Sequence, residues 1–171
     1  MLVIVSLATA LLMEVVAWSA HKYLMHGPLW FLHKDHHVKK PGYFERNDWF
    51  FVIFSIPSIF CMAFGLRWDL EWLLGLGIGQ AIYGFFYILV HDVFVHNRLR
   101  FDLDNPKSLY LKGMLKAHKL HHRCLERQGA DNFGFLWVPK PVRQQLRRES
   151  RLILQRYASY ASSPGFCRVI A

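Results

Sequence analysis

Hydrophobic residues form three long runs in the chain, separated by polar segments. The runs extend from about residue 2 to 20, 49 to 66 and 73 to 90, and only Glu14 interrupts them with a charge. Each run approaches the roughly 20 apolar residues that a helix needs to cross a hydrocarbon core about 30 Å thick. The pattern therefore predicts an all-α fold, a multi-pass membrane helical bundle with three spans.

The last polar segment carries a different pattern. Between residues 141 and 160, apolar residues recur at helical spacing within a basic sequence, which predicts a helix lying on the membrane surface. These apolar residues are Val142, Leu146, Ile153 and Tyr157. By length, residues 1–160 are expected to form a single domain. Residues 161–171 carry no evident chemistry, and we expect them to be a disordered tail.

Charge gives the predicted bundle an orientation. Of the 21 Lys and Arg residues, 20 lie either between Lys22 and Arg46 or after Val90, and three spans place both segments on one side. Because loops rich in Lys and Arg remain cytoplasmic, that side is expected to be the cytoplasm, with the N-terminus outside. No basic stretch precedes Leu2, so we expect the first run to stay as a span rather than to be removed as a signal peptide.

The excess of positive charge also bears on partners. The formal net charge is +9, but the basic residues border the spans, which favours attraction to anionic membrane lipid and argues against nucleic acid. The cysteines show neither a paired spacing nor a CxxC motif, so no disulfide framework is predicted. They are Cys61, Cys124 and Cys167.

All ten histidines fall into four short clusters. The pattern HxxxxH followed by HxxHH occurs twice, first as HKYLMH and HKDHH, and then as HDVFVH and HKLHH. Each HxxxxH pair stands at the cytoplasmic end of the first or third span, and each HxxHH follows in the basic segment beyond. An odd number of spans therefore brings all four clusters to one membrane face. The clusters contain His21, His26, His33, His36, His37, His91, His96, His118, His121 and His122.

The two histidine motifs place their rings differently around an α-helix. On a helix, HxxHH places its three rings on one face. The two rings of HxxxxH lie roughly 140° apart, because each residue turns an α-helix by about 100°. We therefore expect either that the helix end unwinds or that the two rings approach a shared site from different sides. Gly27 and Pro28 should end the first helix directly after His26.

So many clustered imidazoles predict a metal site. Neutral imidazole binds Zn, Cu, Fe and Ni near pH 7, and ten ligands are too many for one ion, so two ions with open positions fit. Nearby carboxylates could orient the ligands. Glu14 is an acid inside a span, seven residues before His21 and hence on the same helical face. The candidate carboxylates are Glu14, Asp35, Glu45, Asp48 and Asp92.

The residues alone leave the identity of the metal open. The HExxH signature of zinc hydrolases is absent, and so is a recognisable motif with a Ser or Cys nucleophile. A non-catalytic membrane protein that binds metal or haem is therefore an alternative, since paired histidines at span ends can ligate haem. A metal transporter fits less well, because it should place polar ligands at mid-membrane depth, where only Glu14 offers one.

The order of the histidine clusters around the spans resembles the membrane fatty-acid hydroxylase and sterol desaturase superfamily. Within it, the chain is most similar to bacterial β-carotene hydroxylases, over roughly residues 13–139. The similar segments are MEVVAWSAHKYLMHG (Met13 to Gly27), WFLHKDHH (Trp30 to His37), FERND (Phe44 to Asp48), YILVHDVFVHNR (Tyr87 to Arg98), KAHKLHH (Lys116 to His122) and FGFLWVP (Phe133 to Pro139).

This resemblance implies a centre of two non-haem iron ions that uses O2 to hydroxylate carbon 3 of carotenoid β-ionone rings. β-Carotene would become β-cryptoxanthin and then zeaxanthin. The alternative within enzymes is a fatty-acid, lipid or sterol hydroxylase or desaturase with the same metal site. A bacterial inner-membrane location is implied, with the metal site on the cytoplasmic face.

Two electrons for each turnover must come from a partner. The chain has no cysteine set for an iron–sulfur cluster, and its glycine-rich run from Gly75 to Gly79 lies within a span, where it favours close helix packing. An external ferredoxin-type electron donor is therefore expected, and the basic face could attract an acidic protein. The substrate, dissolved in the membrane, is expected to approach along aromatic residues: Trp18, Trp30, Phe31, Tyr83, Phe86, Tyr87, Phe94, Phe133, Phe135 and Trp137.

Overall fold

The described part of the computed structural model contains helices and connecting loops but no strands. It comprises residues 1–38, 42, 44–99 and 106–161, with side chains as far as residue 156. The elements are α1 (Leu2–Ser19), the π-helix η1 (Ala20–Met25), α2 (Trp30–His37), the 3-10 turn η2 (Arg46–Asp48), α3 (Trp49–Arg67), α4 (Glu71–Tyr87), the π-helix η3 (Ile88–Val95), α5 (Leu109–His121) and α6 (Lys140–Ala161). The predicted tail, apart from the backbone of Ala161, lies outside the described residues, as do Cys167 and the side chain of Tyr157.

Three continuous helical segments are long and apolar enough to cross a membrane. They are Leu2–Met25, Arg46–Arg67 and Glu71–Val95, and they confirm the predicted multi-pass bundle. The first and third continue five residues beyond the predicted runs, because the helix persists through each HxxxxH motif as η1 and η3. The end of the first helix after His26, at Gly27 and Pro28, agrees with the prediction.

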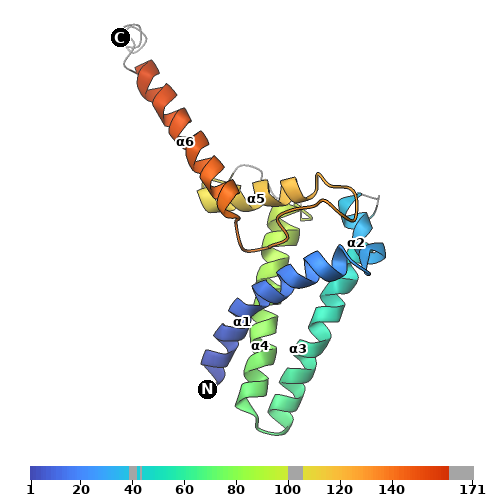
Figure 1. The fold of residues 1–171 in the computed structure, drawn as a ribbon. Helices are drawn as coiled ribbons and strands as arrows, with labels where there is room; N and C mark the ends of the chain where they lie inside the picture. Colours follow the sequence, from blue (N-terminus) through green and yellow to red (C-terminus); the bar gives the residue numbers. More distant parts are fainter. Residues whose placement is uncertain (39–41, 43, 100–105, 162–171) are drawn as a thin grey trace.

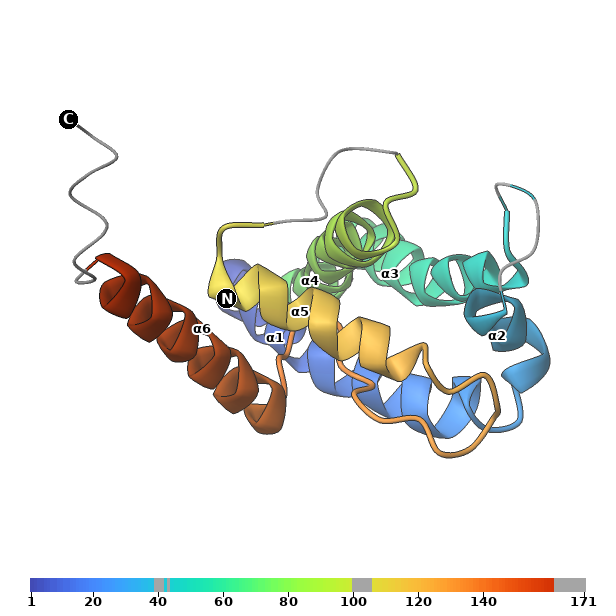
Figure 2. The same cartoon turned by 90° about the horizontal axis from the view of Figure 1, so that it is seen from above.

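The three long helices pack side by side, and the polar elements gather at one end of them. Figure 1 shows α3 and α4 running antiparallel, joined by a short turn, with α1 crossing α4. Asp69 in that turn has a φ of 54°, a left-handed conformation that Asp tolerates better than most residues. At the opposite end, α5 lies across the top of the bundle, beside α2 and the end of α1 (Figure 2).

Glycines in α4 allow its two neighbours to approach closely. A Cβ at Gly79 would lie 2.5 Å from the backbone oxygen of Ser6 in α1, and one at Gly77 would lie 2.7 Å from the backbone oxygen of Ser58 in α3. The Ser58 hydroxyl also donates a hydrogen bond to the carbonyl of Gly77 at 2.7 Å. The glycine-rich run therefore allows the helices to pack closely, as predicted from the sequence.

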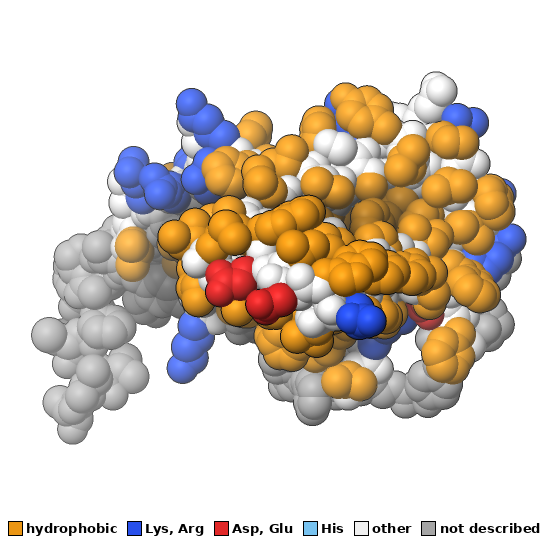
Figure 3. Space-filling view, turned by 90° about the horizontal axis from the view of Figure 1, so that it is seen from below, with side chains coloured by type: hydrophobic (Ala, Val, Ile, Leu, Met, Phe, Trp, Pro, Cys, Tyr) orange, Lys and Arg blue, Asp and Glu red, His pale blue; other side chains and the backbone are white. Residues whose placement is uncertain are grey.

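The outer surface of the spans is apolar. Large side chains such as Leu11 and Ile4 are 78% and 75% exposed. Seen from below, the end of the bundle opposite α5 is covered mostly by hydrophobic side chains, with few charged groups between them (Figure 3). Such a surface would be unfavourable in water and is suited to contact with lipid tails.

Helix α6 leaves the body after its first turns. Val142 is buried and Leu146 half-buried, and both belong to a cluster with Met114 of α5. Further along, Ile153 is exposed, and the helix extends away from the spans (Figure 1). It thus rises from the bundle rather than lying across the ends of the spans, where a helix on the membrane surface was expected.

Candidate metal centre

The ten histidines, although distributed over residues 21–122, converge at one end of the bundle. Their side chains come from η1 and the turn after it, α2, η3 and the turn after it, and α5 with its C-cap. Two sets form, in each of which the possible ligand nitrogens all lie within 4.8 Å of one another. The first set is His21, His26, His33, His37 and His121; the second is His36, His96, His118 and His122. His91 joins the second set through its Nε2, which lies 3.2 Å from the Nε2 of His36.

The two HxxxxH pairs are brought together by π-helices. The backbone N–H of His26 donates to the carbonyl of His21 at 3.0 Å, and that of His96 donates to the carbonyl of His91 at 2.9 Å. These i to i+5 bonds replace the α-helical i to i+4 pattern, so residues five apart lie side by side. The ring centroids are consequently 5.3 Å apart in the first pair and 4.6 Å apart in the second. The helix widens here; it neither unwinds nor leaves the two rings on different sides, which corrects both alternatives offered by the sequence.

In the first set, every ring is held by an oxygen that faces its Nδ1. His21 donates its Nδ1–H to the carbonyl of Phe133 at 2.9 Å, and His33 donates to Oδ1 of Asn47 at 2.6 Å. Since these oxygens can only accept, Nδ1 carries the proton and Nε2 keeps its lone pair. The other three rings donate in the same way to carbonyl oxygens: His26 to Arg127, His37 to Cys124 and His121 to Asp131.

In the second set, two of the rings donate to carboxylates. His36 donates its Nδ1–H to Glu45 at 2.8 Å, and His91 donates to Asp92 at 2.8 Å. The Nε2 of His122 is buried and has no hydrogen-bond partner among the described residues. A buried nitrogen without a partner is unfavourable unless something binds its lone pair.

The spacing of the nitrogens suits a metal ion. The Nε2 atoms of His21 and His37 lie 3.0 and 3.2 Å from that of His33, and those of His96 and His118 lie 2.8 Å apart. Ligands at right angles around an ion with bonds of about 2.1 Å would lie about 3.0 Å apart, and opposite ligands about 4.2 Å apart. Lone pairs facing one another at these distances repel, and a cation between them removes that repulsion. The residues present therefore fit a metal centre.

Burial favours the neutral form of five of the rings: His36, His37, His118, His121 and His122. It lowers the pKa of His37 to about 4, with the neighbouring His26 lowering it further. It also lowers the pKa of His121 to about 3 and that of His122 to about 2. In the second set, burial first and then the His91 and His96 charges hold the pKa of His36 and His118 well below the usual range. Imidazole binds metal as the neutral ring, which is the form present near pH 7.

Two of the five predicted carboxylates contact histidines, and a third lies beside them. Glu45 and Asp92 accept from histidine rings, whereas Asp48 accepts from the backbone N–H of Glu45. Arg98 links all three, at 3.1 Å from Glu45, 2.8 Å from Asp48 and 4.0 Å from Asp92. Burial raises the pKa of Glu45, and the charge of Arg98 opposes this. Arg98 therefore joins the acids that orient His36 and His91.

The other two predicted carboxylates bond groups other than histidines. Asp35 accepts from the backbone N–H and the Nε of Arg46, at 3.0 and 3.2 Å. Glu14, inside the first span, accepts the hydroxyl of Tyr83 at 2.8 Å through one oxygen. Its other oxygen accepts three consecutive backbone N–H groups, each at 3.0 Å, from Phe135, Leu136 and Trp137. Glu14 thus holds residues 135–137 in place, and the nearby carbonyl of Phe133 in the same segment orients His21.

Sequence reasoning missed Asn47, Arg98 and the carbonyl groups that hold the rings. Asn47 and Arg98 lie within FERND and YILVHDVFVHNR, two of the segments that resemble the hydroxylases, and this resemblance was the signal that could have indicated them. The carbonyls of Cys124, Arg127, Asp131 and Phe133 carried no signal at all, because every residue has a backbone oxygen. Their role depends on the path of the segment that follows α5.

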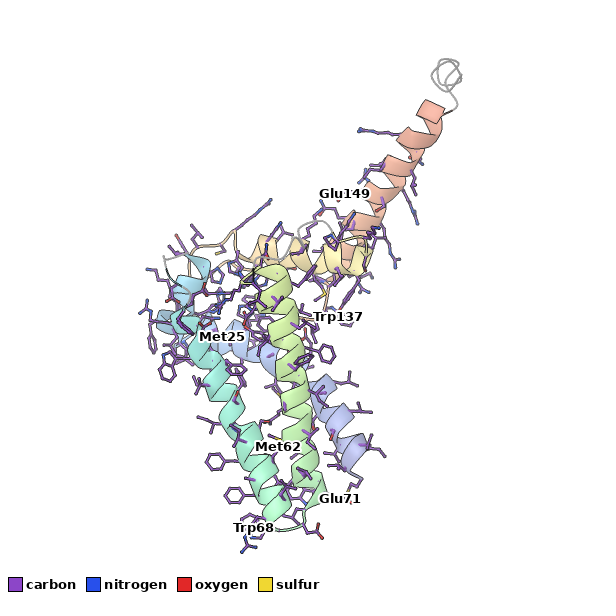
Figure 4. All side chains as sticks on the ribbon, turned by 180° about the vertical axis from the view of Figure 1, so that it is seen from behind. Met25, Met62, Trp68, Glu71, Trp137 and Glu149 are labelled. Atoms are coloured by element: carbon purple, nitrogen blue, oxygen red, sulfur yellow. The ribbon has the colours of Figure 1, made fainter. Side chains whose placement is uncertain are left out.

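An apolar cavity of about 380 Å³ opens between α1, α3 and α4, next to the histidines. Met25 stands at the histidine end and Met62 lies deeper, between α3 and α4 (Figure 4). Tyr87 and Phe135 line the cavity and also stack on histidine rings: Tyr87 on His91 at 4.7 Å and Phe135 on His21 at 5.0 Å between centroids. These two aromatic side chains form the boundary between cavity and cluster.

The remaining aromatic residues proposed for a substrate path have different surroundings. Tyr83 lines the cavity with Tyr87 and Phe135, whereas Trp30 and Phe133 lie against histidine rings. Trp18 and Trp137 line a separate hollow near Phe133. Phe31 and Phe86 are exposed, and Phe94 is half-buried. The predicted path therefore reduces to three aromatic residues on the cavity wall.

Comparison with known proteins identifies the family of the chain. The family model described as Fatty acid hydroxylase matches residues 6–139, a range that includes all ten histidines. The chain belongs to the fatty acid hydroxylase family. As a member of this family, it is a hydroxylating oxidoreductase of the membrane.

Several known proteins are similar in sequence to this fatty acid hydroxylase over most of its length. A protein named Beta-carotene hydroxylase from Pseudescherichia vulneris is 39% identical over 141 residues, covering 81% of this chain and 78% of its own. The protein of the same name from Pantoea ananas is 41% identical over 133 residues, covering 77% and 74%. The one from Paracoccus sp. (strain PC1) is 35% identical over 153 residues, covering 87% and 93%. No solved structure matches the chain significantly.

Proposed function

We propose that this chain hydroxylates carbon 3 of carotenoid β-ionone rings, converting β-carotene to β-cryptoxanthin and then to zeaxanthin. The observation that carries the proposal is its 35–41% identity to proteins named Beta-carotene hydroxylase over most of both chains. The apolar cavity beside the histidines supports it, because β-carotene is a hydrocarbon that dissolves in the bilayer. A volume of about 380 Å³ is within the roughly 300–1,000 Å³ typical of small-molecule sites.

The proposed cofactor is a pair of non-haem iron ions. The first histidine set would hold one ion, and the second set with His91 would hold the other. Seven of the ten imidazoles have an oxygen facing Nδ1 and direct Nε2 toward the cluster, which suits a dinuclear site with positions left open for O2. When bound, the iron would supply the activation of O2 and the oxidising power that an unactivated C–H bond demands.

The chain's own residues would position the substrate and protect the site. A β-ionone ring at the histidine end of the cavity would lie against Tyr87 and Phe135, which stack on His91 and His21. These rings would keep water from the reacting carbon and fix its distance from the cluster. Glu14 would act one step further away, because it anchors the segment that carries Phe135. The rest of the polyene would extend toward the bilayer.

Each hydroxylation would consume one O2, two electrons and two protons. One oxygen atom would enter the C–OH group and the other would leave as water. The free cysteines Cys61 and Cys124 are too few for an iron–sulfur cluster within the described residues, so the electrons would come from an external ferredoxin-type protein.

We further propose that the metal-binding end faces the cytoplasm of a bacterial cell, in the inner membrane. The basic segments flank this end of the bundle, and Lys and Arg mark cytoplasmic loops. Alkaline phosphatase fused after Arg67, in the connection between α3 and α4, should be active in the periplasm. The same reporter fused after Lys140 should be inactive, and the reverse result would contradict this orientation.

An acyl-lipid, sterol or fatty-acid substrate is the second candidate, favoured by the description of the family model. Product analysis separates the two, because each substrate class gives its own hydroxylated product. Haem would need only two of the histidines, and a Soret band in the purified protein would reveal it.

Expression in a bacterium that accumulates β-carotene, followed by pigment chromatography, tests the main proposal. We expect β-cryptoxanthin and zeaxanthin to form with the wild type and neither to form with His121→Ala, which should still insert into the membrane. Unchanged β-carotene in the presence of iron-loaded protein and an electron donor would refute the substrate. Elemental analysis should give about two iron ions per chain, and a value near one would refute the dinuclear site.

A further inference from the structure

Helix α5 carries histidines on one side and cations on the other. The cations recur at intervals of four, three and four residues, so they form a single stripe along the helix and the turn that follows it. We call Lys112, Lys116, Lys119 and Arg123 the α5 cationic stripe. Three of them are exposed and Lys116 is half-buried. Within the described residues, no carboxylate forms an ion pair with Lys112, Lys119 or Arg123.

The α5 cationic stripe is separated from the histidine cluster by the thickness of one helix. At about 100° per residue, the direction of the stripe differs by roughly 140° from that of His118, His121 and His122. An α-helix with its side chains is only about 10–12 Å across. The histidine side is buried, with His121 fully so, while the stripe meets solvent. Among the described elements, it is α5 itself that separates the stripe from these rings.

The stripe borders a groove whose floor is apolar. Leu115, Leu120 and Leu146 line a hollow of about 420 Å³ together with all four cations and Pro106. Leu146 belongs to α6, which extends from this point away from the spans (Figures 1 and 2). The groove therefore lies on the side of α5 where a water-soluble protein can reach it.

We propose that the α5 cationic stripe and its groove are the docking site for an acidic electron-carrier protein with a one-electron centre. This inference rests on the proposed hydroxylation, which needs two electrons per turnover from outside the chain. Two reduced carriers would be oxidised in succession, and O2 would be reduced to the C–OH oxygen and one water. Charged rims steer such partners, and an apolar floor between cations adds contact area.

One carboxylate of the chain already binds the stripe. Glu149 of α6 accepts a hydrogen bond from the Nζ of Lys116 at 2.8 Å and also one from Gln145. Figure 4 places Glu149 on α6, well away from the spans. Carboxylates of an acidic partner would bind Lys112, Lys119 and Arg123 in the same way that Glu149 binds Lys116. An anionic lipid headgroup is the competing source of negative charge, but the groove opens beside α6, which extends away from the membrane spans.

Charge reversal tests the docking site. The triple variant Lys112→Glu, Lys119→Glu, Arg123→Glu would be compared with the wild type in phosphatidylcholine nanodiscs, loaded with iron and β-carotene. The probe is an acidic [2Fe–2S] ferredoxin kept reduced by NADPH and its reductase. We expect the KM for ferredoxin to rise at least about 10-fold at low ionic strength. We also expect the strong salt dependence of the wild-type KM to disappear.

A matched control carries the same change of charge elsewhere. Arg147→Glu, Arg148→Glu, Arg151→Glu alters three exposed cations of α6 that do not line the groove. We expect its KM for ferredoxin to stay within about 3-fold of the wild type. An equal rise in both variants would mean that net charge alone acts, which would overturn the proposed site. So would an effect seen only in nanodiscs with anionic lipid, which would assign the stripe to headgroups.

Chemical reduction separates this inference from the proposed function. Each variant would be reduced with dithionite and methyl viologen, freed of excess reductant and then exposed to O2 for a single turnover. We expect the triple variant to give wild-type iron content and product yield, because ferredoxin is bypassed. If the wild type gives no hydroxylated carotenoid, the proposed function fails. If it does, and the triple variant keeps a wild-type KM for ferredoxin, only the docking site fails. Lys112→Glu alone, six residues from the nearest ligand, should show part of the effect without disturbing the metal centre.

Discussion

The carboxylate of Glu14, inside the first span, accepts a hydrogen bond from the backbone N–H of Phe135 at 3.0 Å. The same oxygen accepts the next two backbone N–H groups, and the other oxygen accepts the hydroxyl of Tyr83. One acid thus satisfies four donors from two distant segments. It holds Phe135 against the cavity and, through the same segment, the Phe133 carbonyl against His21.

Removing this acid should loosen the metal centre without touching a ligand. In Glu14→Ala, three backbone donors and a hydroxyl lose their acceptor, and each buried donor left unpaired costs about 1–3 kcal/mol. We expect a lower thermal midpoint and reduced iron content. Tyr83→Phe removes one of the four bonds and should lower the free energy of unfolding by only about 1 kcal/mol. Equal stability of the two variants would show that the backbone bonds to Glu14 contribute nothing.

Asn47 should matter for metal affinity because its Oδ1 fixes the ring of His33 at 2.6 Å. Groups that orient a metal ligand typically change affinity by about 10–100-fold when removed. We expect Asn47→Ala to weaken iron binding in this range, measured by competition with a chelator. Gln144→Ala, at an exposed position of α6, is the control and should bind iron normally. Unchanged affinity in Asn47→Ala would mean that the hydrogen bond does not orient His33.

The cavity can be filled from Gly84 without disturbing the packing of helices. A Cβ at Gly84 has no atom within 4 Å, and the residue lines the cavity. We expect Gly84→Leu to lower carotenoid hydroxylation roughly 10-fold or more, since a side chain now occupies the space for substrate. Iron content should remain at the wild-type value. Val16→Leu enlarges an exposed side chain of α1 outside the cavity and should leave turnover unchanged. Full activity of Gly84→Leu would place the substrate elsewhere.

The metal-free protein should lose stability as the pH falls. The pKa of His37 is about 4 in the folded chain against an ordinary value of 6.5, and that of His121 is about 3. Between these values the unfolded chain binds more protons than the folded chain, so the free energy of unfolding decreases as the pH decreases. We expect the thermal midpoint of the metal-free protein to be lower at pH 5 than at pH 7. A midpoint that rises on acidification would contradict the buried, neutral state of the rings.

Much of this architecture follows from the sequence because it depends on local composition. Three apolar runs predict three spans, since a helix is the simplest structure that satisfies its backbone polar groups in hydrocarbon. The odd number of spans places both halves of the histidine pattern at one end, before any contact is known. Gly27 and Pro28 mark the end of the first helix, and the glycines of α4 mark close packing, as observed.

Other features arise only when distant segments meet. The spacing of five residues between His21 and His26 suits an α-helix poorly, and the structure resolves this with a π-helix. The oxygens facing the Nδ1 atoms come largely from the backbone after α5, whose path no residue type announces. Glu14 was a candidate to orient the histidines because it shares a helical face with His21, yet it bonds the segment that contains Phe135.

The sequence by itself determined the three spans, the shared face of the ten histidines and the chemistry of their rings. The tertiary structure decided how those rings are grouped, which atoms orient them and where the apolar cavity lies beside them. The physical reason is the range of the interactions concerned. Hydrophobic runs and ligand types are properties of single segments, whereas the direction of a lone pair depends on an oxygen that the fold brings from as many as 112 residues away.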